Sequence, residues 1–324
     1  MKPVLGILLV FVALFTSSSF CQDIKVREQA VLLLERANAV SSSPKLPNLE
    51  RVDTFRAYSE AGVQEGSFSR VVIQGVGRRE EYNFGAFHLL NVHTQKQVAV
   101  AGSPKIVPAE LMKVLQITPI WRGQFDDEDV IHAISDRTVG GAAARCIEFD
   151  TIQGQHTDNN EICVDAKTGA IVRSRLGGEV IENSEFFSFA GALYPGKISY
   201  ARSSGTQKIE ISQTMTVLDN ADANVLASPP DAQIRKLCTT FRRAFGVSMP
   251  QPKAGNGAQA DDVVVRAMVG VDGRVYDATV QDSDREDLNP EALGLAKQWT
   301  FTPAMCDGRA NTQEVYVTLH FSGR

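Results

Sequence analysis

The sequence lacks the short motifs by which most enzyme classes are recognised. It has no Gly-x-Ser-x-Gly, HExxH, phosphate-loop or dinucleotide-binding pattern. Histidine is scarce, with five in the chain. His88 and His93 should face opposite sides of one strand, His156 falls in a polar turn, and His320 points outward on the last strand. We therefore expect no catalytic residue and a protein that is not an enzyme.

The sequence also has no excess of positive charge, no proline-rich stretch and no paired-cysteine motif. The chain has 33 Lys and Arg against 38 Asp and Glu, a net charge of −5, which argues against a broad nucleic-acid surface. No polybasic cluster of the membrane-binding kind is evident. The 13 prolines form no extended rod. No C-x-x-C pair occurs, so we expect no metal site, and no cofactor is indicated.

The N-terminus has the layout of a secretory signal peptide. Lys2 supplies positive charge, an apolar run follows from Val4 to Phe15, and small residues come next. The run is shorter than a bilayer span. We expect a signal peptide over 1–21, cleavage near Gln22 and a periplasmic protein; an uncleaved inner-membrane anchor is the alternative.

Four cysteines lie beyond Cys21, and four cysteines allow three pairings in an exported chain. Cys146 and Cys163 flank a polar turn at 154–161 and can face each other on a hairpin. We predict a disulfide between them, which leaves a second between Cys238 and Cys306.

The N-terminal part is dominated by strand patterns. One helix is expected over 26–39, from its apolar stripe of period 3.6, and a short one after Pro108. Between Arg51 and Leu218, alternation such as that of Ile209 and Ile211 recurs between turn signals. The fold class predicted is α+β: a curved antiparallel sheet or half-barrel with few helices over 22–225, followed by a small ββαβ domain.

This N-terminal layout resembles the LolA/LolB-type lipoprotein-carrier fold. The resemblance rests on an initial helix followed by a sheet meander. It implies a half-barrel plugged by helices, with an apolar concave face that could hold a lipid.

Residues 226–258 change character. A helix is predicted over Ala232 to Phe245, because one helical face would carry Ile234, Leu237, Phe241 and Ala244. A proline- and glycine-rich linker follows to Ala258, and the last domain is placed at 259–324.

The last domain has a regular order of elements. Alternate residues from Val263 to Val271 share a strand face, and Arg266 should point the other way. Asp272 and Gly273 predict a type I′ hairpin turn. Asn289 is expected to be a helix N-cap with Pro290 at the first helical position. A core-facing helical stripe is expected from Ala292, Leu293, Ala296 and Trp299.

The segment after that helix is distinctive. It reads W-x-F-x-P-A, followed by a glycine, at Trp299, Phe301, Pro303, Ala304 and Gly308. With the preceding elements it resembles the C-terminal domain of the TonB family over 259–324. Trp299 and Phe301 are expected in the core.

The resemblance implies that the final strand is a partner-binding edge. An extended peptide of another protein would add to it by β-strand addition, and the same edge could form a homodimer. The strand comprises Glu314, Val315, Tyr316, Val317, Thr318, Leu319, His320 and Phe321.

Three functions stay open. The first is a periplasmic protein that binds a protein partner or envelope component through its last domain. The second is a lipid or lipoprotein carrier that uses the N-terminal sheet. The third is an energy transducer for outer-membrane transport, which requires an uncleaved leader. The missing rod argues against the third.

Overall fold

The computed structural model describes residues 17–59, 62–103, 106–117, 124–126, 129–151, 160–202, 207–219, 222–252, 260–283 and 285–322. Most of the predicted signal peptide, the turn with His156 and most of the predicted linker lie outside them. The chain forms two compact units: Met1–Leu46, Ala57–Val63 and Ile117–Thr214, and then Pro47–Arg56, Gln64–Gln116 and Met215–Arg324. Among the described residues, no helix has both the length and the apolar character of a membrane span.

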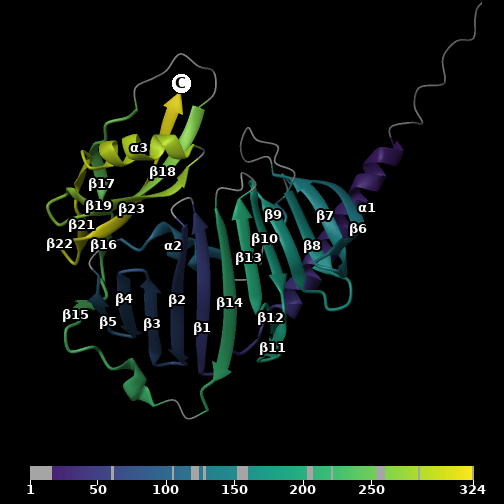
Figure 1. Ribbon diagram of the computed structural model, residues 1–324, viewed down its shortest axis with the longest axis horizontal. Helices are drawn as coiled ribbons and strands as arrows, with labels where there is room; N and C mark the ends of the chain where they lie inside the picture. Colours follow the sequence, from purple (N-terminus) through teal and green to yellow (C-terminus); the bar gives the residue numbers. More distant parts are fainter. Residues whose placement is uncertain are drawn as a thin grey trace, which may run out of the picture. The chain divides into compact units, whose positions relative to one another are not determined.

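The first unit contains one long helix and a run of antiparallel strands (Figure 1). The helix is α1, Ser17–Val40. Two strands form a small hairpin, β11 (Phe187–Phe189) and β12 (Ala192–Tyr194). The larger run is hydrogen-bonded in the order β14 (Lys208–Val217), β13 (Lys197–Arg202), β10 (Glu179–Ser184), β9 (Ile171–Leu176), β8 (Asn160–Asp165), β7 (Ala142–Asp150) and β6 (Val130–Val139).

Helix α1 covers one face of these strands. Its predicted stripe supplies Ala30, Leu34 and Ala37, which are almost fully buried. They pack with strand residues Ile147, Phe149, Ile162, Val164 and Ile171. The Arg27 guanidinium donates hydrogen bonds of 2.7 and 2.6 Å to the carbonyls of Asp129 and Asp126. The amphipathic pattern therefore forms the helix that it predicted.

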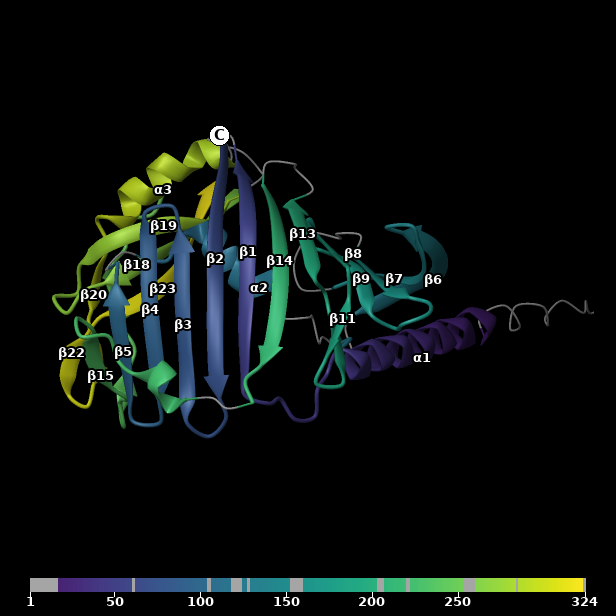
Figure 2. The ribbon, with the colours of Figure 1, turned by 60° about the horizontal axis from the view of Figure 1, so that its bottom comes forward.

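The second unit contains a further run of neighbouring strands, which Figure 2 shows side by side. Their order is β15 (Gln233–Lys236), β5 (Gln97–Gly102), β4 (Phe87–Thr94), β3 (Gly77–Phe84), β2 (Gly62–Ile73) and β1 (Leu49–Ser59). Most of β1 and β2 belongs to this unit, and most of β14 to the first. Helix α2, Ala109–Ile117, begins after Pro108 as expected. A short 3₁₀ turn, η1 (Ala223–Leu226), packs against the apolar face of β2, β4 and β5.

The C-terminal part of the second unit is a three-stranded sheet with one helix and several short strands. The sheet order is β19 (Val275–Ser283), β18 (Ala260–Val269) and β23 (Gln313–Ser322). The 3₁₀ turn η2 (Glu286–Leu288) leads into α3 (Asn289–Ala296). The short strands are β16 (Phe241–Arg242), β17 (Phe245–Ser248), β20 (Thr300–Thr302), β21 (Ala304–Cys306) and β22 (Arg309–Asn311).

The predicted fold class is confirmed: the chain is α+β, with antiparallel sheets, few helices and a terminal ββαβ arrangement. Both predicted disulfides are present, Cys146–Cys163 between neighbouring strands and Cys238–Cys306. The predicted domain boundaries stay a prediction.

The helix predicted over Ala232 to Phe245 is wrong. This segment is extended, because β15 pairs with β5, β16 with β21 and β17 with β20. The residues that suggested a buried helical face are half exposed, at 50% for Ile234, 53% for Leu237 and 51% for Phe241. Backbone pairing with distant strands outweighs local periodicity here.

The two Asp-Gly turns of the chain differ from each other. The predicted type I′ turn at Asp272 is wrong: only Gly273 has a positive φ, of 78°, and the Gly270 amide bonds to Arg274 in a longer loop. Val271 lies in this loop and is 57% exposed, so it does not extend the strand face. The type I′ geometry occurs instead at Asp307 and Gly308, with φ of 48° and 79°, between β21 and β22.

Replacing Gly273 by alanine should destabilise the protein more than replacing Gly308. Both glycines have a φ near +80°, which costs an L-residue about 1 kcal/mol. A Cβ at position 273 would also lie 2.0 Å from the carbonyl oxygen of Phe301, whereas nothing lies within 4 Å at position 308. We expect G308A to lower the free energy of unfolding by about 1 kcal/mol and G273A by at least about 3 kcal/mol, measured by urea denaturation. Equal losses would contradict the close approach.

Candidate functional site

The last sheet is anchored by a well-packed core on one face. Alternate β18 residues Val263, Val265, Ala267 and Val269 are fully buried, as are Ala292 and Ala296 of α3. Leu293 and Val317 are partly buried against the same cluster. The predicted strand and helix faces are therefore correct over these positions, and they fix one side of β23.

The start of α3 differs from the prediction. Asn289 has helical dihedral angles and is the first residue of the helix, not its N-cap. Leu288 occupies the cap position and makes no side-chain cap hydrogen bond. The turn η2 leads into the helix instead, and within it the Asn289 amide donates a hydrogen bond to the Glu286 carbonyl. Pro290 remains in the first turn, where its missing N–H costs little.

The W-x-F-x-P-A segment is structural. Trp299 and Ala304 are almost completely buried, and Phe301 is 8% exposed. The Trp299 indole donates to the carbonyl of Pro250 over 3.4 Å, and the Phe301 amide donates to Gly273 over 2.8 Å. Pro303 is partly buried and Gly308 is exposed in its turn. These residues hold the sheet together and do not offer a binding surface of their own.

Strand β23 is an edge strand. It pairs with β18 over all ten residues, and within the described chain β18 is its one neighbour. Leu319 and Phe321 are buried, whereas Tyr316, Thr318 and His320 are exposed on the other face. The outer backbone edge is thus held by a fixed strand, which is what strand addition requires.

The exposed face of β23 carries two polar contacts. His320 Nδ1 lies 2.7 Å from Asp262 Oδ1 on the neighbouring strand. The Tyr316 hydroxyl donates to Glu314 over 2.9 Å. Partial burial is the main cause that raises the pKa of Tyr316, and the contact with Glu314 raises it further. Tyr316 is therefore a neutral hydroxyl at physiological pH.

Arg266 is a buried cation that the sequence pattern did not reveal. It does point away from the Val263 face, but it is completely buried. Its guanidinium donates to the carbonyl of Val107 and, over 3.0 Å, to Gln281, while Nε lies 3.4 Å from a Glu314 oxygen. Burial lowers the pKa of Arg266, and Glu314 opposes this effect. The strand alternation could predict its direction, but not that a distant segment covers it.

The segment 238–249 is bonded at several points to residues 306–313. The Cys238–Cys306 disulfide holds its start. The Asp307 carboxylate accepts from the Thr239 and Thr240 amides, at 3.2 and 2.7 Å. These bonds lower the pKa of Asp307, the Thr240 amide most strongly. Further along, the Ala244 amide donates to Gln313 of β23 over 2.6 Å.

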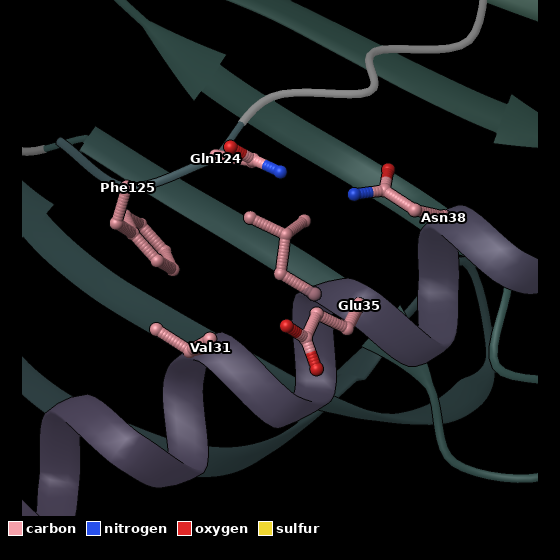
Figure 3. Close-up of a pocket in the computed structure, with 6 residues that line it drawn as sticks. Val31, Glu35, Asn38, Gln124 and Phe125 are labelled. Atoms are coloured by element: carbon pink, nitrogen blue, oxygen red, sulfur yellow. The ribbon is translucent and has the colours of Figure 1, made fainter.

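The first unit contains a small cavity beside α1 (Figure 3). Val31, Glu35 and Asn38 of the helix face Gln124 and Phe125, and Leu34 completes the lining. Its volume is about 210 Å³.

On the sheet, Glu161 lies next to Cys146 and Cys163. The two sulfurs are bonded to each other, so this trio does not offer thiolate ligands.

Residues 252–322 match the family model described as the Gram-negative bacterial TonB protein C-terminal. The match confirms the resemblance predicted for the last domain. No curated protein matches the chain.

Among solved structures, the chain is similar to a DUF1329 family protein from Desulfovibrio piger, with 12% identity, 62% of this chain and 97% of that chain covered, and a TM-score of 0.40. A LolA superfamily protein from Nitrosomonas europaea shows 11% identity, 60% and 95% coverage, and a TM-score of 0.37. The MucA/MucB complex of Pseudomonas aeruginosa shows 11% identity, 76% and 81% coverage, and a TM-score of 0.29.

The Asp307 contacts should give the protein a pH-dependent component of stability. Because the folded state lowers the pKa of this carboxyl below its ordinary value of 3.8, the stabilisation is complete above that value and is lost as pH falls through the lower folded pKa. Asp307→Asn keeps a residue that tolerates positive φ. We expect wild type to exceed D307N in Tm at pH 7, with the difference shrinking at pH 3 and below. A constant Tm difference from pH 7 to pH 2.5 would contradict this role.

Proposed function

We propose that this chain is an exported, non-enzymatic protein of the Gram-negative cell envelope that binds a protein partner through the outer edge of β23. The observation that carries the proposal is that no strand of the described residues pairs with the outer edge of β23, in a domain that matches the TonB C-terminal model. The partner would supply an extended segment that pairs with this edge. The periplasm is the compartment that the leader pattern and the two disulfides favour.

The geometry of β23 supports strand addition physically. An edge strand presents unpaired N–H and C=O groups that a second extended chain can satisfy. Leu319 and Phe321 hold the strand to the core, so little conformational entropy is lost when a partner binds. The exposed Tyr316, Thr318 and His320 would contact alternate side chains of the added strand. Main-chain bonds would supply affinity and these side chains specificity.

Two tyrosines give a matched test of the edge. Tyr316 on β23 and Tyr276 on β19 are 52% and 53% exposed, and they lie on the opposite outer strands of one sheet. Each is replaced by the photoreactive analogue p-benzoylphenylalanine, and cells are irradiated. We expect a discrete covalent adduct with another protein from position 316 and none from position 276, detected by immunoblotting and identified by mass spectrometry.

The outcomes separate the partner classes. An adduct of twice the mass of the chain from position 316 would indicate a homodimer through the same edge. Adducts from position 276 alone, or from neither position, would contradict a β23 docking edge. Position 276 keeps the same chemistry and exposure, so general surface collisions would label both positions equally.

The carrier hypothesis for the N-terminal sheet has weaker support. The sheet face below α1 is filled by Ala30, Leu34 and Ala37 and their strand contacts. The neighbouring cavity, of about 210 Å³, is below the roughly 300–1,000 Å³ of most ligand pockets. An acyl chain would have to displace α1 to reach this face.

The mass of the protein recovered from cells tests export and cargo together. We expect a chain that begins near Gln22, with four cysteines oxidised, and without a bound lipid in native mass spectrometry. A stoichiometric lipid adduct would favour the carrier. An intact N-terminus in the membrane fraction would favour the anchored transducer.

A further inference from the structure

The extended segment 241–249 exposes large apolar side chains, although it is firmly held. Phe245 is 77% exposed, Val247 69% and Phe241 51%. Phe245 stands opposite Thr302, which is exposed, whereas the next residue, Gly246, stands opposite the buried Phe301. Phe245 therefore points away from the core. Adjacent exposed apolar residues on a rigid surface are a mark of an interaction site.

Exposed arginines adjoin these apolar groups. Arg242 and Arg243 lie between the two phenylalanines in sequence, and both are exposed. Arg309 joins them through the fold: Phe241, Cys306 and Arg309 stand in one row across β16, β21 and β22, and residues in such a row project to the same face. Within the described residues, no ion pair involves Arg242, Arg243 or Arg309. We call residues 241–249 together with Arg309 the aromatic–basic ribbon.

The ribbon differs in charge from the rest of the chain. The protein has a net charge of −5, yet residues 232–260 contain five Lys and Arg and no Asp or Glu. The carboxylate of Asp307 accepts from the amides of Thr239 and Thr240 at the start of this segment and keeps its negative charge. The ribbon itself carries three arginines and no acidic residue, so its net charge is positive beside an apolar surface, and it complements a partner that is both anionic and apolar.

We propose that the aromatic–basic ribbon docks the protein on an anionic phospholipid bilayer. Phenylalanine side chains enter the boundary between headgroups and acyl chains, and arginines bind the headgroup phosphates. An acidic peptide is less well matched, because the pairing of β17 with β20 is irregular between Gly246 and Ser248, so β17 is not a regular strand that a peptide could extend. Irregularities of this kind disfavour strand addition. The ribbon thus offers side chains to a surface, whereas β23 offers a backbone edge to a strand.

Vesicle binding by the full chain tests this surface. The partition coefficient is measured by co-sedimentation with vesicles of phosphatidylglycerol and phosphatidylethanolamine, and with neutral phosphatidylcholine vesicles. An arginine near an anionic surface changes partitioning about fivefold. We expect R242Q/R243Q to bind the anionic vesicles about 25-fold more weakly and the neutral vesicles unchanged. The control R56Q/R145Q removes two exposed arginines elsewhere, with the same change in total charge, and should bind as wild type does.

A local reporter separates the ribbon from the N-terminal apolar run. In F245W, we expect a blue shift of tryptophan fluorescence with anionic vesicles and quenching by brominated lipid, beyond the changes of the wild-type tryptophans. Equal partitioning of R242Q/R243Q and R56Q/R145Q, or no quenching at position 245, would overturn the proposal. Binding to a poly-glutamate peptide with the same arginine dependence, but not to vesicles, would also overturn it and assign the ribbon to an acidic segment.

Discussion

The C-terminal module depends on one strip of backbone, residues 299–306, which is bonded along both sides. On one side the Phe301 amide binds the Gly273 carbonyl, and Thr300 bridges to Arg274. On the other side β20 and β21 pair with β17 and β16. Beneath, Trp299 and Phe301 fill the core of the sheet. The strip therefore holds the β18–β19 hairpin and the aromatic–basic ribbon in place. Its two aromatic residues, Trp299 and Phe301, point into the core of the sheet.

The same strip explains why two different surfaces remain available. It is bonded to the β18–β19 loop and to one edge of segment 241–249, and within the described part of the chain no strand pairs with the outer edge of β23. The Cys238–Cys306 disulfide joins residues 68 positions apart in sequence, a closure worth about 4 kcal/mol in the chain-entropy description. Because the disulfide holds segment 241–249 in place, this segment does not need to bury its own apolar side chains to stay extended, and Phe245 remains exposed.

The sequence predicted the features that depend on local pattern. The α1 stripe, the β18 alternation, the buried Trp299 and both disulfides follow from periodicity and spacing. It failed where distant segments decide. The 232–245 helix is replaced by strand pairing, and Arg266 is buried by the segment at Val107. The two Asp-Gly turns look alike in sequence but differ in geometry. The longer loop at Gly273 is bonded to Phe301, whereas the type I′ turn at Gly308 joins the short strands β21 and β22.

The two surfaces meet at Gln313. Its backbone begins β23 and pairs with Val269, while its side-chain oxygen accepts the Ala244 amide of the ribbon over 2.6 Å. A strand that adds to β23 uses backbone groups on the outer edge and leaves this side-chain bond intact. A bilayer that contacts Phe245 and the arginines likewise leaves the β23 backbone free. The proposed strand addition and the proposed bilayer contact therefore do not compete for the Gln313 bonds.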